Sequence, residues 1–108
     1  MIVITSDTMG RGSEEPGGRL IVTFTHQLVG LPPHPDGLVF CNAGVRLLAP
    51  GSVVLDTLQQ LEHAAVELLA CSTCVEHCGL VGQTGAGRIT DMREIVATLT
   101  SAERVVTI

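Results

Sequence analysis

Hydrophobic residues recur along the chain in short blocks that polar, glycine-rich or proline-rich segments separate. Five blocks predict strands: Ile2–Thr5, Leu38–Asn42, Val66–Ala70, Arg88–Thr90 and Arg104–Ile108. The longer blocks are continuously apolar, and such runs are typical of strands that are buried on both faces of a sheet. The sequence therefore favours a sheet whose two faces are both covered.

Between these strands, apolar residues follow a helical spacing in Arg19–Val29 and in Val53–Ala64. Ser52 is a polar residue of the type that commonly caps the start of a helix. The segments "SDTMGRGSEEPGG" and "AGVRLLAPGS" predict loops, because they are rich in glycine and proline. The prolines of "GLPPHPDG" end the first helix.

Two further helices are expected towards the C-terminus. A short one begins near Thr73 or Cys74 and ends at Gly79, since glycine is the residue that most often follows a helix end. Thr90 or Asp91 caps the last helix. Its apolar positions are Met92, Ile95, Val96 and Leu99.

Strands that alternate with helices predict a single α/β domain over residues 1–108, with a mostly parallel five-stranded sheet. In such sheets, sites lie at the carboxyl ends of the strands. Those ends are Ser6–Gly12, Cys41–Gly44, Cys71–Cys74 and Thr90–Met92. Cysteines from two strands therefore meet at the edge where chemistry is expected.

Composition excludes several classes of function. The chain has 108 residues, a net charge of −5, no lysine, and two aromatic residues. Nucleic acid and anionic membrane surfaces are poor partners, because a basic stripe and aromatic stacking platforms are missing. No apolar run reaches the ~20 residues of a spanning helix, and the first residues lack the charged region of a signal peptide. We expect a cytoplasmic protein with reduced thiols, whose cysteines serve reactivity or metal binding.

The stretch "ACSTCVEHCGL" holds three of the four cysteines. Cys71 ends a strand just before a helix, where the helix dipole favours a thiolate nucleophile. Cys74 completes a C-x-x-C pair and could exchange with Cys71. His77 and Cys78 are adjacent on a helix and project about 100° apart, which suits one tetrahedral metal site poorly. We therefore expect no metal, and we interpret Cys41 as a packing residue.

The loop after the first strand, "SDTMGRG", resembles a dinucleotide fingerprint only superficially. Its third glycine is missing, and no helix opens directly after it, so no nucleotide cofactor is expected. Asp7 and Arg11 are available to contact a small anion or a partner. Thr90, Asp91 and Met92 are interpreted as a helix cap and its first apolar residue.

Four separated motifs, "VITSDTMGRG", "FCNAGVRLL", "LLACSTCVEHCGL" and "GRITDM", together resemble the DsrE-like domain of the YedF family. The resemblance runs from Val3 to Ile108. It implies a three-layer α/β/α sandwich, oligomers, and a sulfurtransferase-like role linked to selenium metabolism. Some members of the wider DsrE/TusD superfamily relay sulfur as a cysteine persulfide.

Carried over residue by residue, the resemblance assigns the reactive position to Cys71 and the second cysteine to Cys74. Asn42 and Gly44 match an "N-x-G-V" motif that shapes the site. Members of the family usually carry a TusA-like sulfur-carrier domain with a Cys-Pro motif, and this chain contains no Cys-Pro. The expected partner is therefore a separate sulfur-carrier protein or a small thiol or persulfide, and the chain is expected to form a homo-oligomer.

Three hypotheses follow. In the first, Cys71 accepts sulfur as a persulfide, and Cys74 resolves it. In the second, the protein is a non-catalytic oligomeric docking module for a sulfur carrier, and its cysteines only pack. In the third, it is a C-x-x-C redox or metal protein. Leu47, Leu48 and the Pro32–Pro33 region are apolar in predicted loops, which can mark oligomer contacts.

Overall fold

The computed structural model describes residues 1–108 and contains five strands, four α-helices and one 3₁₀ helix. The strands are β1 (Ile2–Ile4), β2 (Gly37–Phe40), β3 (Glu67–Cys71), β4 (Arg88–Thr90) and β5 (Val106–Thr107). The helices are α1 (Glu14–Gly30), α2 (Leu55–His63), α3 (Ser72–His77) and α4 (Met92–Ser101), with the 3₁₀ helix η1 at Asn42–Leu48. No helix is long and apolar enough to cross a membrane.

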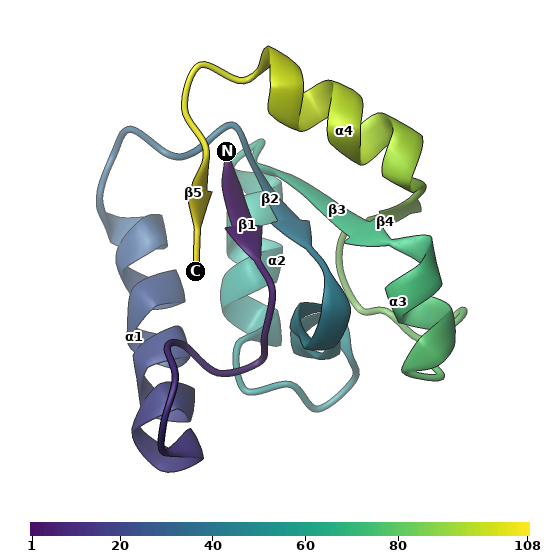
Figure 1. The fold of residues 1–108 in the computed structure, drawn as a ribbon. Helices are drawn as coiled ribbons and strands as arrows, with labels where there is room; N and C mark the ends of the chain where they lie inside the picture. The colour runs from purple at the N-terminus through teal and green to yellow at the C-terminus, as the bar shows by residue number, and fades with distance from the viewer.

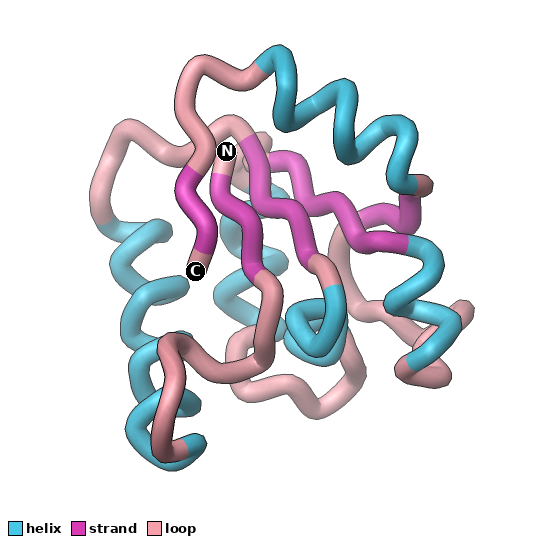
Figure 2. Tube along the Cα trace, viewed as in Figure 1, coloured by secondary structure: helices cyan, strands magenta, loops and turns pink.

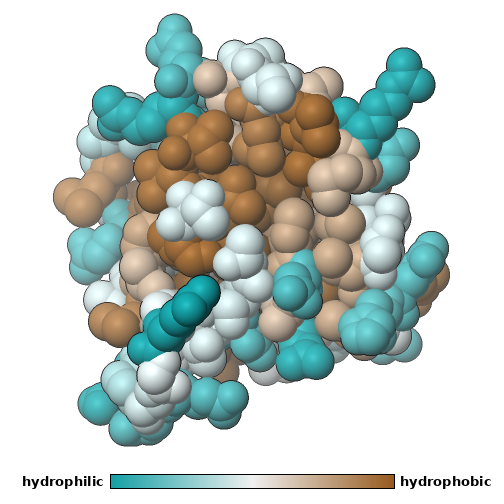
Figure 3. All heavy atoms as spheres, viewed as in Figure 1, coloured by the Kyte–Doolittle hydropathy of each residue, from teal (hydrophilic) through white to brown (hydrophobic).

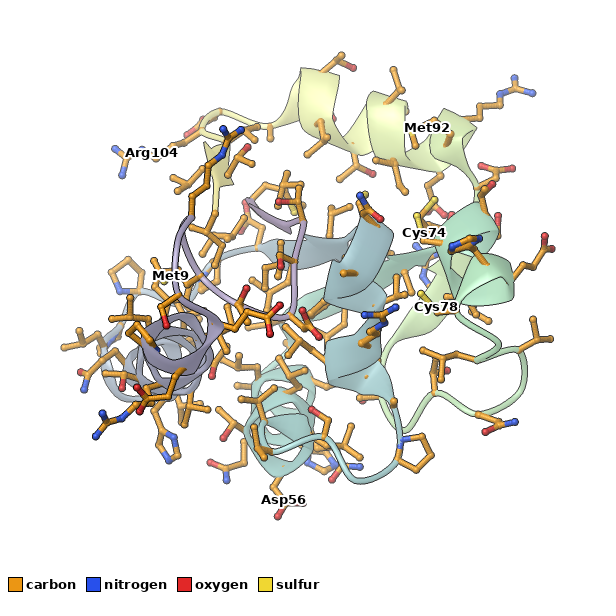
Figure 4. The ribbon with its side chains drawn as sticks, turned by 60° about the horizontal axis from the view of Figure 1, so that its bottom comes forward. Met9, Asp56, Cys74, Cys78, Met92 and Arg104 are labelled. Carbon is orange, nitrogen blue, oxygen red and sulfur yellow. The ribbon has the colours of Figure 1, made fainter.

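All strand pairings are parallel, and the sheet order is β4-β3-β2-β1-β5. Helices α1 and α2 pack side by side on one face, and α4 covers the other (Figures 1 and 4). The arrows of Figure 1 show that the strands point the same way, and Figure 2 shows helical segments, η1 and α3, following the carboxyl ends of β2 and β3. The predicted three-layer α/β/α arrangement with a five-stranded parallel sheet is confirmed.

Side chains alternate between the two faces of the sheet, as the pleat of a strand requires. In β2, Leu38 and Phe40 join the larger core beneath α1 and α2, whereas Val39 joins the smaller core beneath α4. In β3, Leu69 and Cys71 likewise face α4. The position of Cys71 in the strand therefore decides that its sulfur lies under that helix.

The starts of two helices differ from the prediction. Helix α1 begins at Glu14, five residues before the predicted start, because Pro16 lies in the first turn, where a missing N–H costs nothing. Helix α2 begins at Leu55 with Val54 as its N-cap residue, so the cap predicted at Ser52 is wrong. The Ser52 hydroxyl instead accepts a hydrogen bond from the Val54 N–H, at 3.3 Å.

The predicted connector after β2 is a 3₁₀ helix, and it belongs to the core. Leu47 and Leu48 are buried, because η1 directs both side chains into the core between the sheet and α2. They therefore cannot mark an oligomer contact, although the Pro32–Pro33 region is exposed. Figure 3 shows a separate apolar area on the face of the molecule seen there. Exposed valines occur on α4 and β5, among them Val96 and Val106.

Candidate thiol site

The carboxyl ends of β2 and β3 bring four free thiols into one region, although they come from three different elements. Cys41 leaves β2, Cys71 ends β3, and Cys74 and Cys78 lie on α3 and at its end. Cys41, Cys71 and Cys74 pack in the small core beneath α4, and Cys78 packs against the larger core. This juxtaposition agrees with the expectation that cysteines of two strands share one sheet edge.

Cys71 is nearly inaccessible. Its residue is 3 % exposed, and its neighbours in the core include Leu69 of the same strand and Ile95 of α4. It serves as the N-cap residue of α3, yet its side chain makes no capping hydrogen bond. A dissolved molecule therefore cannot reach this sulfur without movement of α4 or α3.

Cys74 is the thiol that faces solvent from the first turns of α3. It lines an open cavity of about 230 Å³ together with Asn42, Thr73, His77 and Cys78. Figure 4 shows Cys74 on α3 and Cys78 at the end of that helix, close to the start of α4, where Met92 lies. The cavity is the place where a small sulfur compound or the tip of a partner chain would meet a thiol.

A backbone donor is aimed at the Cys74 sulfur. The N–H of Asn42 donates to Cys74 Sγ, at 3.0 Å. Asn42 has a φ of +51°, a left-handed conformation that asparagine tolerates better than most residues, and this turn directs its N–H towards α3. A fixed donor of this kind stabilises negative charge on sulfur, whether as a thiolate or as a persulfide anion.

The electrostatic balance nevertheless keeps Cys74 protonated near neutral pH. Burial raises the pKa of the Cys74 thiol, the Asn42 N–H lowers it, and the neighbouring thiols of Cys71 and Cys78 raise it again, with a net rise. The pKa of Cys41 is also raised, chiefly by burial and then by Cys71 and Cys74. Thiolate formation at this site therefore needs help from a base or from alkaline pH.

Gly44 and Asn42 both shape this edge of the sheet. A Cβ at Gly44 would lie against the carbonyl oxygen of Ile4, so only glycine lets η1 approach the end of β1 so closely. Asn42 lines the thiol cavity, whereas Gly44 lies buried below it. The site-shaping role that the resemblance implies agrees with these positions but is not tested by them.

The other predicted site residues lie outside the thiol cavity. Arg11 lines a separate cavity of about 420 Å³ beside the ends of β1 and β5, and Asp7 lies in the same loop. The Asp91 side chain caps α4 by accepting from the Glu94 N–H at 3.0 Å, as predicted. Thr90 is buried at the end of β4, and Met92 is 54 % exposed rather than packed.

Sequence reasoning undervalued three residues of the cavity wall, namely Thr73, His77 and Cys78. Helical spacing could have indicated them, because residues three and four apart lie on one face of a helix. His77 and Cys78 follow Cys74 by three and four residues, and Thr73 precedes His77 by four. No group of three or more histidine, cysteine, aspartate or glutamate side chains is arranged to hold a metal ion.

Two solved structures resemble this chain over nearly its whole length. YchN from E. coli is 23% identical with a TM-score of 0.65, covering 99% of this chain and 97% of its own. MTH1491 from Methanobacterium thermoautotrophicum, described as a protein of unknown function, is 18% identical with a TM-score of 0.69, covering 99% and 96%. No protein-family model and no curated protein matches the chain. The likeness shows that the chain shares the fold of these two structures.

Proposed function

We propose that this protein handles sulfur by carrying it as a persulfide on a cysteine of the thiol cavity. One observation carries the proposal: Cys74 faces an open cavity while a backbone N–H from Asn42 points at its sulfur, at 3.0 Å. The fold shared with YchN and MTH1491 and the four sequence motifs that resemble the YedF family of the DsrE/TusD superfamily support the same assignment.

The roles of the two predicted cysteines are exchanged in this proposal. Cys74 accepts the sulfur, because it lines the cavity, whereas Cys71 is 3 % exposed. The Cys74 thiolate attacks the outer sulfur of a donor persulfide, a new S–S bond forms, and the donor leaves as a thiol after gaining a proton. Cys71 packs beside Cys74 and can attack the inner sulfur, which releases hydrosulfide and leaves a Cys71–Cys74 disulfide. A small thiol then reduces that disulfide.

The donor in this scheme is a sulfur-carrier protein of the TusA type or a small persulfide. A carrier fits because the cavity is open to solvent, so a cysteine at the end of a flexible segment could enter it. The same displacement chemistry would move selenium, which is the link that the YedF resemblance suggests. Self-association and location in the cytoplasm stay predictions from the sequence.

Intact-mass measurement after incubation with glutathione persulfide tests the proposal. Wild type should gain the mass of a sulfur atom, Cys74→Ser should lose most of this uptake, and Cys78→Ser should retain it as a control from the same cavity. Uptake that persists in Cys74→Ser but disappears in Cys71→Ser would return the acceptor role to Cys71.

The two alternatives predict different masses. A docking module without reactive thiols takes up no sulfur in any variant. A C-x-x-C redox protein takes up none either, but a mild disulfide oxidant converts it to a species that has lost two hydrogens, and this species is absent in both Cys71→Ser and Cys74→Ser.

A further inference from the structure

His77 is the one ionisable side chain on the cavity wall that is not a thiol. The wall consists of Asn42, Thr73, Cys74, His77 and Cys78. An amide and a hydroxyl are not bases at neutral pH, and the Asn42 N–H can only donate. A proton that leaves the Cys74 sulfur therefore has a single side-chain nitrogen base on the wall, the imidazole of His77.

The helix places this imidazole beside the sulfur. Cys74 and His77 both belong to α3 and are three residues apart, so their side chains lie on one face with Cβ atoms about 5–6 Å apart. Side chains on a helix lean towards its N-terminus, so His77 leans over the turn that carries Cys74. His77 is exposed, which lets its ring rotate and lets water exchange its proton.

We propose that His77 accepts the proton of the Cys74 thiol and returns it to the departing thiolate of the donor. This inference rests on the proposed function and deepens it. The Cys74 S–H proton moves to an imidazole nitrogen as Sγ bonds to the outer sulfur of R–S–SH. The R–S bond to that sulfur breaks, and R–S⁻ takes the proton from the imidazolium. Cys74–SH and R–S–SH thus become Cys74–S–SH and R–SH, and no oxidant is needed.

Other charged groups close to this helix lie outside the wall. Glu76 of α3 and Arg46 of η1 are exposed, and neither lines the cavity. Cys41 approaches Cys74 from β2 but is itself a thiol whose pKa is raised by burial. The need for a base follows from the raised pKa of Cys74, which leaves little thiolate at neutral pH.

The test compares rates of sulfur uptake from glutathione persulfide in wild type, His77→Gln and His63→Gln across pH 7 to 10. His63 is an exposed histidine at the end of α2, so it controls for the same chemical change. His77→Gln should take up sulfur at least about tenfold more slowly than wild type at neutral pH, since general base catalysis contributes this much or more. The ratio of the wild-type rate to the His77→Gln rate should fall towards one at alkaline pH, because hydroxide then forms the Cys74 thiolate without His77.

Imidazole added to His77→Ala should restore part of the rate at neutral pH, whereas a purely structural role would not respond to it. Equal rates in wild type and His77→Gln would overturn the inference, although sulfur uptake itself would remain. A ratio of these two rates that stays constant from pH 7 to 10 would overturn it as well. Absence of uptake in wild type would instead refute the proposed function, and the inference with it.

Discussion

At the scale of single residues, burial separates four thiols that look alike in the sequence. Cys71 is buried beneath α4, Cys41 is half-buried, and Cys74 and Cys78 line the cavity. The pattern C-x-x-C indicates that two sulfurs can approach each other, but it does not say which one meets the solvent. That depends on the side of β3 that α4 covers, and no local pattern encodes it.

This difference predicts an order of alkylation in the native protein. Iodoacetamide should modify Cys78 and Cys74 at least about tenfold faster than Cys71, because a buried thiol reacts only after local opening. The rate at Cys74 should continue to rise above pH 8.5, close to the pKa of an ordinary thiol, since burial and neighbouring thiols raise its pKa. Peptide mass mapping over a pH series measures both effects.

Denatured protein is the control for this labelling, because all four cysteines should then react at similar rates. Native labelling of Cys71 as fast as Cys78 would contradict the burial argument. Complete native protection of all four thiols would favour the docking-module hypothesis over the sulfur-carrying one.

At the scale of elements, the site depends on how closely η1 lies against β1. A Cβ added at Gly44 would stand 2.2 Å from the carbonyl oxygen of Ile4, and backbone cannot move aside cheaply. We expect Gly44→Ala to lower the free energy of unfolding by at least about 2 kcal/mol. Urea unfolding followed by circular dichroism measures this loss.

Gly18 offers a matched control within α1. A Cβ there would meet nothing within 4 Å, and the residue lies in a helix. Gly18→Ala should therefore raise the free energy of unfolding by about 0.5–1 kcal/mol, because alanine favours the helix more than glycine. If Gly44→Ala were as stable as wild type, η1 would have to pack differently from the arrangement described.

Most elements could be predicted because each carries its own periodic pattern, but two were missed for physical reasons. The beginning of α1 contains Pro16, Gly17 and Gly18, residues that usually indicate a loop. The first turn of a helix nevertheless tolerates proline. The 3₁₀ helix η1 has no 3.6-residue period to detect. Burial of its leucines became clear only once the element was placed against the sheet.

At the scale of the whole molecule, a charged cluster holds α4 to the edge of the sheet. Arg88 of β4 donates to Glu94 of α4 at 2.7 and 2.6 Å, and to Glu67 of β3 at 2.5 Å. The Thr90 hydroxyl also donates to Glu94. Since α4 covers the face on which Cys71 is buried, this cluster also helps to keep α4 packed over the Cys71 side chain.

The cluster predicts a pH-dependent contribution to stability. Arg88, followed by Thr90, lowers the pKa of Glu94 to about 2, from an ordinary value of 4.5. A carboxylate whose pKa is lowered in the folded state stabilises the fold above its ordinary pKa and loses this effect as the pH falls through 4.5 towards 2. The Glu94 side chain is 40 % exposed, so solvent screens the effect and keeps it modest.

Glu94→Gln should therefore lower Tm by a few degrees at pH 7, and this difference from wild type should shrink steadily below pH 4.5. Glu76→Gln is the matched control, because Glu76 is an exposed glutamate without an ion pair, and it should leave Tm nearly unchanged. Calorimetry at several pH values measures both variants. A Glu94→Gln difference that stayed constant down to pH 2 would mean that the loss arises from packing of α4 rather than from the charge of Glu94.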